Sequence, residues 1–191
     1  MRTFIALELP DSLKDGILAL IGELRSRGIR AGWSKRGTLH LTLKFLGEID
    51  ESFQDDVIGA VRRAAAAVPP FWFDTSGIGA FPSDARPRVL WVGVDSGQEL
   101  YDLARLVESE LAAVGFPSER RPFHPHVTLG RIRDPRGATG VAEALTTLKA
   151  PEGRVVVRDV RVMKSTLAPA GAIHEVLAEL PLCEGADRAS A

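Results

Sequence analysis

Two segments of the chain, HLTLKFLG (residues 40–47) and HPHVTLGR (residues 124–131), contain a histidine, an apolar residue, a threonine and a leucine in the same order. The chain has only four histidines, and nine of its 191 residues are threonine. Composition alone would put threonine two places after two of four histidines in only about 1% of such chains. The two segments therefore indicate a structural unit that occurs twice.

Both segments alternate between apolar and polar residues, a pattern typical of β-strands, whose successive side chains point to opposite faces. The polar side chains are therefore expected on one face: His40, Thr42 and Lys44 in the first strand, His126 and Thr128 in the second. The apolar side chains are expected on the other face: Leu41, Leu43 and Phe45, and Val127 and Leu129.

The rest of the chain predicts further helices and strands around these two segments. Apolar residues at helical spacing predict helices at residues 11–27 and 51–67, one from about residue 100 that ends at Gly115, and a weaker one at 139–149. Strands are expected near residues 3–9, 39–47, 71–78, 88–94, 126–132, 154–160, 160–167 and 173–180. Each half has one histidine strand, which predicts a single α+β domain of two lobes over residues 1–182. Residues 183–191 are expected to form a mobile tail.

The net charge, the cysteine count and the distribution of apolar residues restrict the classes of function. The formal net charge of −1 argues against a dedicated duplex-DNA binder but leaves room for a nucleotide or an RNA end. A single cysteine rules out an internal disulfide. The N-terminus has no signal-peptide pattern, and no apolar run reaches the length of a membrane span. We therefore expect a cytoplasmic monomer with no membrane contact.

The two polar strand faces would bring two imidazoles and two hydroxyls together if the lobes meet across a cleft. Histidine titrates near neutral pH and can act as a general acid or a general base. Threonine hydroxyls can donate hydrogen bonds to phosphate oxygens as their charge builds up. This set of groups suits cleavage of a phosphate ester, whereas either histidine alone would be read as a residue on a solvated sheet face.

The paired segments resemble the H-x-T-x motifs of the 2H phosphoesterases. The closest resemblance is to the bacterial and archaeal RNA 2′,3′-cyclic phosphodiesterases, once called 2′-5′ RNA ligases. RTFIALELP (residues 2–10) is similar to the opening strand of that family, and GAFPSDARPRVLWVGV (residues 79–94) to its middle hairpin. The order and spacing of these blocks agree over almost the whole chain.

The resemblance implies a bilobal α+β fold with a rough two-fold axis, two antiparallel sheets lining a central cleft, and helices outside. It also implies hydrolysis of RNA or nucleoside 2′,3′-cyclic phosphates to 2′-phosphate ends, without a metal or another cofactor. By this resemblance His40 is the proton donor, His126 is the proton acceptor, and Thr42 and Thr128 hold the phosphate. Family members can also join RNA ends through a 2′-5′ linkage by the reverse reaction.

Three further residues are candidates for substrate binding. Arg131 suits a phosphate, but simple alternation puts it opposite His126 unless the strand bends near Gly130. Lys44 has the parity to add positive charge to the cleft, although a solvated lysine is the alternative. Phe81 could stack on a base or anchor its loop on the core.

Other interpretations stay open. His124 and His126 have the H-x-H spacing of some zinc hydrolases, although a zinc site would need further ligands. At His174, where relatives often carry tyrosine, we expect a surface residue. Trp33 and Trp91 are expected to be packing residues, and the arginine-rich stretch 118–133 could guide an RNA backbone. A nucleotide- or RNA-binding module without turnover is the alternative function.

Overall fold

The structure is a computed structural model, and it describes residues 1–169 and 171–183. The helices are α1 (Asp11–Ser26), α2 (Gln54–Ala65), α3 (Gln98–Ala113) and α4 (Val141–Thr147). The strands are β1 (Arg2–Leu7), β2 (Gly32–Trp33), β3 (Leu41–Glu48), β4 (Phe71–Phe81), β5 (Val89–Ser96), β6 (His126–Arg131), β7 (Arg154–Val157), β8 (Asp159–Ala168) and β9 (Gly171–Pro181). Short 3-10 turns span Arg36–Thr38, Glu51–Phe53 and Pro135–Ala138.

The strands form one curved sheet in the order β7-β4-β5-β6-β3-β1-β8-β9, with β2 paired to β6. All the pairings are antiparallel. The order splits into two halves of four strands that meet where β3 pairs with β6, at the single residue pair Leu41–Val127. The predicted bilobal α+β arrangement is confirmed, but the two expected sheets are continuous, because this pair joins them.

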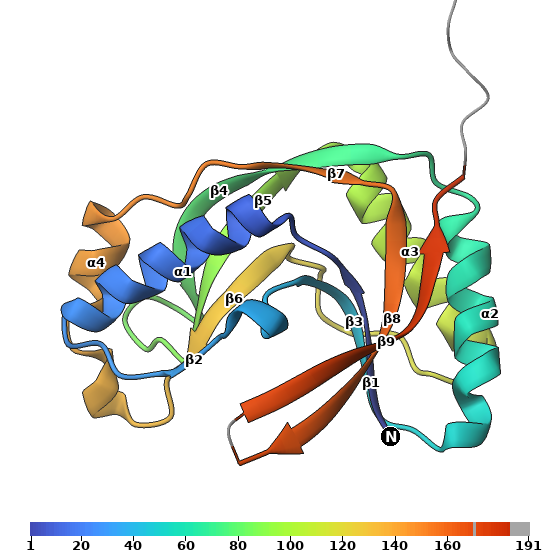
Figure 1. Cartoon of the computed structure of the whole chain (residues 1–191), viewed down its shortest axis with the longest axis horizontal. Helices are drawn as coiled ribbons and strands as arrows, with labels where there is room; N and C mark the ends of the chain where they lie inside the picture. Colours follow the sequence, from blue (N-terminus) through green and yellow to red (C-terminus); the bar gives the residue numbers. More distant parts are fainter. Residues whose placement is uncertain (170, 184–191) are drawn as a thin grey trace, which may run out of the picture.

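The helices divide between the two halves. Figure 1 shows α1 and α4 at one end of the molecule and α2 and α3 at the other. Helices α2 and α3 contact each other, α2 contacts β8 and β9, and α3 contacts β3. Each helix buries a stripe of apolar residues at helical spacing, such as Leu13, Ile17, Leu20, Ile21 and Leu24 of α1. This burial fixes the sheet that carries the two histidine segments.

The centre of the sheet is fully buried on the face that carries the main core. Leu41 and Val127, which join the halves, are both 0% exposed. Strand β1 shows how the two faces differ: Ile5 belongs to the main core, whereas its neighbour Phe4 belongs to a small second cluster with Ala6 and Met163. Polar and aromatic side chains of the site lie on that second face.

The expected helices and strands are confirmed, with ends shifted by a few residues. The helix predicted to stop at Gly115 ends at Ala113, and Gly115 has a φ of +97°, a conformation that favours glycine. The two-residue strand β2 and the 3-10 turns are not among the elements expected from the sequence. The tail expected at 183–191 lies outside the described residues from residue 184 on. Within the described part of the chain, no helix is long and apolar enough to cross a membrane.

Candidate functional site

The two histidine segments lie side by side in the centre of the sheet. His40 directly precedes β3, and His126 is the first residue of β6. Because the strands are antiparallel about the Leu41–Val127 pair, the chain direction puts Thr42 on the side of His126 and Thr128 on the side of His40. Each histidine thus has the threonine of the other segment as its neighbour across the strands.

A bulge in β6 decides where Arg131 points. Trp91 pairs with Thr128, but the next pair is Leu90 with Gly130, so that Leu129 is an extra residue on β6. A single extra residue reverses the alternation beyond it. Arg131 consequently lines the same cavity as His126. The bulge thus supplies the irregularity near Gly130 that Arg131 needs to reach the substrate.

A matching bulge in β3 overturns two expectations. Thr42 pairs with Ala6 and Lys44 with Ile5, so that Leu43 is the extra residue. Phe45, expected on the core face, is instead 56% exposed and lines the cavity.

Lys44 lines the cavity, where it was expected to add positive charge, and it is not the solvated lysine of the alternative. Its side chain is on the buried side, with the residue 3% exposed. Its ammonium donates to Glu108 at 2.6 Å and to the carbonyl oxygen of Pro117 at 2.9 Å. Lys44 is therefore a buried ion-pair partner that ties β3 to α3 and to the loop that follows α3.

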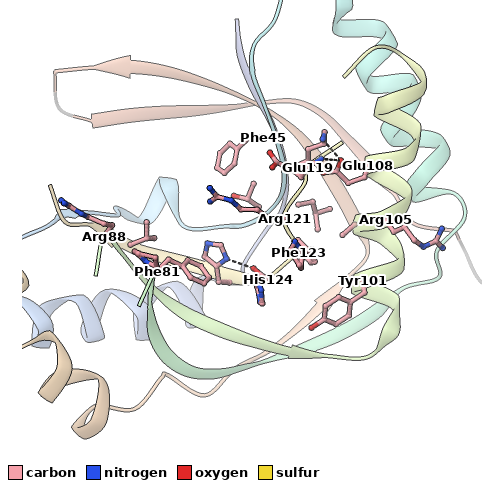
Figure 2. Close-up of a pocket in the computed structure, with 18 of the residues that line it drawn as sticks. Phe45, Phe81, Arg88, Tyr101, Arg105, Glu108, Glu119, Arg121, Phe123 and His124 are labelled. Carbon is pink, nitrogen blue, oxygen red and sulfur yellow. Dashed lines mark hydrogen bonds and ion pairs between the residues drawn. The ribbon is translucent and has the colours of Figure 1, made fainter. Parts of the chain in front are cut away.

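The cavity over the sheet has a volume of about 970 Å³ and takes residues from both halves (Figure 2). Five candidate site residues predicted from the sequence line it: Thr42, Lys44, Phe81, His126 and Arg131. His40 and Thr128 are not among its lining residues. Arg121, Phe123 and Tyr101 also line the cavity. The sequence included Arg121 only as part of the arginine-rich stretch 118–133. It did not single out Phe123 or Tyr101, because they come from a loop and a helix without a repeated pattern.

His126 is held by its own segment. Its Nδ1 lies 2.7 Å from the carbonyl oxygen of His124. A carbonyl oxygen only accepts, so Nδ1 carries the hydrogen and Nε2 is the basic nitrogen of the neutral ring. Burial lowers the pKa of His126, and the nearby charge of Arg131 lowers it further, against a hydrogen bond to His124 that raises it.

Two aromatic rings lie beside His126. Phe81 meets the imidazole edge-to-face at 5.1 Å between ring centroids, and Trp91 lies at 6.5 Å. Trp91 was expected to be a packing residue, and it packs against Phe81, with 5.2 Å between ring centroids. The ring fits because Gly79 and Gly93 lie under it, where a Cβ would come within 2.4 Å and 3.2 Å of it. Trp33 does pack on the core, as expected.

His40 is held by aromatic rings. Phe4 stacks on it at 4.8 Å, and His174 meets it edge-to-face at 5.2 Å. Burial lowers the pKa of His40 to about 4, and the nearby imidazole of His174 adds to this effect. The charges of Lys14 and His126 act in the same direction, whereas a hydrogen bond to the backbone of Thr38 raises the pKa.

His174 was expected at the surface, and this expectation is wrong. The hairpin of β8 and β9 places it half-buried against Phe4 as well as His40, at 4.9 Å from the Phe4 ring. Its Nδ1 is buried and has no hydrogen-bond partner among the described residues. Strand alternation alone could not reveal this contact, because it joins residues 134 positions apart in the chain.

The H-x-H pair does not gather further ligands. His124 lines the cavity near Phe81, with 6.2 Å between ring centroids. Among the described residues, no three side chains of histidine, cysteine, aspartate or glutamate are placed to hold one metal ion.

Comparison with known proteins identifies the family. The family model of the 2′-5′ RNA ligase superfamily matches residues 10–168. The chain belongs to this superfamily. Among curated members, an RNA 2′,3′-cyclic phosphodiesterase of Thermotoga maritima is 34% identical over 179 residues, covering 94% of each chain. One of Methanothermobacter thermautotrophicus is 33% identical over 175 residues, covering 91% of this chain and 95% of its own.

Solved structures of similar proteins have the same fold. The crystal structure of TT0787 from Thermus thermophilus has a TM-score of 0.78 at 27% identity and covers 97% of this chain and 100% of its own. Escherichia coli LigT complexed with 3′-AMP has a TM-score of 0.72 at 25% identity, with 95% and 97% covered. The 2H phosphoesterase fold expected for this member of the superfamily is therefore confirmed.

Proposed function

We propose that this chain hydrolyses RNA or nucleoside 2′,3′-cyclic phosphates to 2′-phosphate ends, with His40 and His126 as an acid–base pair. Membership of the superfamily and the activity named for its curated relatives support the reaction. The observation that carries the proposal is the Leu41–Val127 pair, which sets the two H-x-T segments side by side and antiparallel.

His126 acts as the general base. Its Nδ1–H is engaged by the His124 carbonyl, so Nε2 takes a proton from the attacking water. The lowered pKa of His126 keeps this nitrogen unprotonated at neutral pH. The water oxygen forms a bond to phosphorus, and the bond between phosphorus and the 3′ oxygen breaks.

His40 acts as the general acid and donates its proton to the departing 3′ oxygen. A pKa of about 4 leaves the ring neutral at pH 7 in the free protein. A phosphate diester carries a negative charge, and an opposite charge nearby favours the protonated imidazole. Substrate binding therefore has to raise the pKa of His40. Proton exchange with solvent then resets both rings.

The remaining groups hold the phosphate and the base. The hydroxyls of Thr42 and Thr128 donate to the non-bridging oxygens as their charge grows. Arg131 adds a fixed positive charge beside His126, and the ring of Phe81 offers a face for a base. The mechanism uses no cofactor. The same proposal has three further parts. The protein can join RNA ends through a 2′-5′ linkage by the reverse reaction, it acts in the cytoplasm, and it is a monomer.

The proposal is tested by measuring turnover in the presence of EDTA. The substrates are 2′,3′-cyclic nucleotides and RNA with cyclic-phosphate ends. We expect turnover to persist with the chelator and the product to carry phosphate on the 2′ oxygen. Complete loss of turnover with EDTA, with metal in the purified protein, would favour the zinc hydrolase that uses His124 and His126. Tight binding of a 2′-phosphate nucleotide with no turnover would favour the binding module.

A further inference from the structure

Four cationic side chains besides Arg131 line the cavity: Lys44, Arg88, Arg105 and Arg121. Arg121 belongs to the loop between α3 and β6, and Figure 2 shows it reaching into the cavity on the side of Phe45. Within residues 1–169 and 171–183, no acidic side chain pairs with it. By contrast, Lys44 pairs with Glu108 at 2.6 Å, and Arg105 pairs with Asp102 of its own helix at 3.4 Å. Arg88 donates to the carbonyl oxygen of Arg133 at 3.2 Å. An unpaired guanidinium in a cleft is suited to an anionic ligand.

Arg121 and Arg131 act on different parts of the cavity. The charge of Arg131 is close enough to lower the pKa of His126. Arg121 is not among the groups that shift the pKa of His126 or His40. If Arg131 serves the reacting phosphate, Arg121 is placed for a different anion.

The surroundings of Arg121 fit a nucleotide chain. Phe45, Tyr101 and Phe123 add aromatic rings to the same cavity. Two acids, Glu108 and Glu119, also line the cavity. Glu108 forms an ion pair with Lys44. Glu119 lies beside Glu108 (Figure 2), and its backbone N–H donates to the Glu108 carboxylate at 3.1 Å. A volume of about 970 Å³ lies at the upper end of the range for small-ligand sites and exceeds the need of one cyclic nucleotide.

We propose that Arg121 binds the phosphodiester on the 5′ side of the terminal nucleotide, so that the cleft is built for RNA ends of at least two nucleotides. This inference rests on the proposed hydrolysis of terminal cyclic phosphates. Such a contact adds affinity for the chain without taking part in the reaction at its end.

The test compares two substrates: a 2′,3′-cyclic mononucleotide with no 5′ phosphate, and a dinucleotide that ends in a 2′,3′-cyclic phosphate. Only the dinucleotide has the second phosphate. Arg121→Ala is expected to lower kcat/KM for the dinucleotide by about 10- to 100-fold, the range for a charge-assisted hydrogen bond. For the mononucleotide it should change kcat/KM by less than about twofold. Arg121→Lys should retain part of the dinucleotide activity.

Arg105→Ala is the matched control. It removes a positive charge that also lines the cavity but already pairs with Asp102, so it should leave the ratio of the two substrates unchanged. An equal loss on both substrates with Arg121→Ala, or no loss on either, would overturn the inference. If the unaltered protein turned over neither substrate, the proposed function would fail separately. Calorimetry would then still decide the role of Arg121, by measuring the binding of a dinucleotide that ends in a 2′-phosphate. Weaker binding by Arg121→Ala than by the unaltered protein supports the role, and equal binding overturns it.

Discussion

His40 and His126 begin equivalent strands of the two halves, yet their surroundings differ. The His126 ring is oriented by a hydrogen bond to a carbonyl two residues away. The aromatic rings beside it, Phe81 and Trp91, come from β4 and β5 of its own half. His40 is packed between Phe4 and His174, and its pKa is about 4. One motif thus gives two different imidazoles, because the neighbouring strands supply different groups.

The bulges extend this comparison. In each strand the residue directly after the threonine is an extra residue, and the residue five places after each histidine then lines the cavity. That residue is Phe45 in one half and Arg131 in the other. The duplicated backbone therefore presents an aromatic wall on one side and a cationic wall on the other, which suits a ligand that has both a base and a phosphate.

The largest expected effect concerns the two imidazoles themselves. His40→Ala and His126→Ala should each lower turnover of a cyclic-phosphate substrate by about 10² to 10⁴, because each removes one proton-transfer step. Circular dichroism should show that both variants remain folded. Full activity in either variant would contradict the assignment of His40 and His126 as an acid–base pair.

The junction between the halves should control stability. Leu41→Ala removes a fully buried side chain where β3 meets β6, and it should lower the free energy of unfolding by about 2–5 kcal/mol in urea titrations. Val156→Ala, on edge strand β7 and 56% exposed, is the control and should change it by less than about 0.5 kcal/mol. Equal effects of the two variants would mean that the junction is not part of the cooperative core.

The buried His40 should make the fold sensitive to acid. Its folded pKa of about 4 lies below the ordinary 6.5, so the unfolded chain takes up a proton first as the pH falls. The contribution of His40 to the free energy of unfolding should be constant above about pH 6.5 and fall by at most about 3 kcal/mol down to pH 4. His40→Asn should reduce this fall in urea titrations at several pH values. An unchanged pH dependence would show that His40 is not shielded as described.

Substrate binding should move the pH profile. The profile of kcat/KM reports the free protein, and that of kcat reports the complex. Because the anionic phosphate raises the pKa of His40, the alkaline limb of kcat should lie at higher pH than that of kcat/KM. Coincident limbs would contradict the assignment of His40 as the acid.

The smallest effect is expected at His174. His174→Ala opens space beside His40 and should lower kcat about tenfold with little change in KM, because the acid loses its orientation. His174→Phe keeps a ring in that position and should retain most of the activity. If the phenylalanine variant were as impaired as the alanine variant, a ring nitrogen rather than the ring packing would be required.

Several features could be predicted from the sequence because they depend on local pattern. The strands, the helices and the repeated H-x-T segments follow from residues that are close in the chain. The side-chain parity could be predicted only as far as Thr42 and Thr128. Beyond them the bulges at Leu43 and Leu129 reverse the alternation, and a bulge depends on the partner strand. For this reason Lys44 is not solvated, and Phe45 does not lie on the core face as expected.

The sequence by itself determined that two imidazole–hydroxyl pairs lie on two similar strands, and its motifs indicated the superfamily that the comparisons confirm. Only the tertiary structure decided that the strands join at Leu41 and Val127 and that His174 contacts His40. It also decided that Arg121 shares the cavity with Arg131. The physical reason is that strand pairing and burial bring together residues far apart in the chain, and no local pattern contains that information.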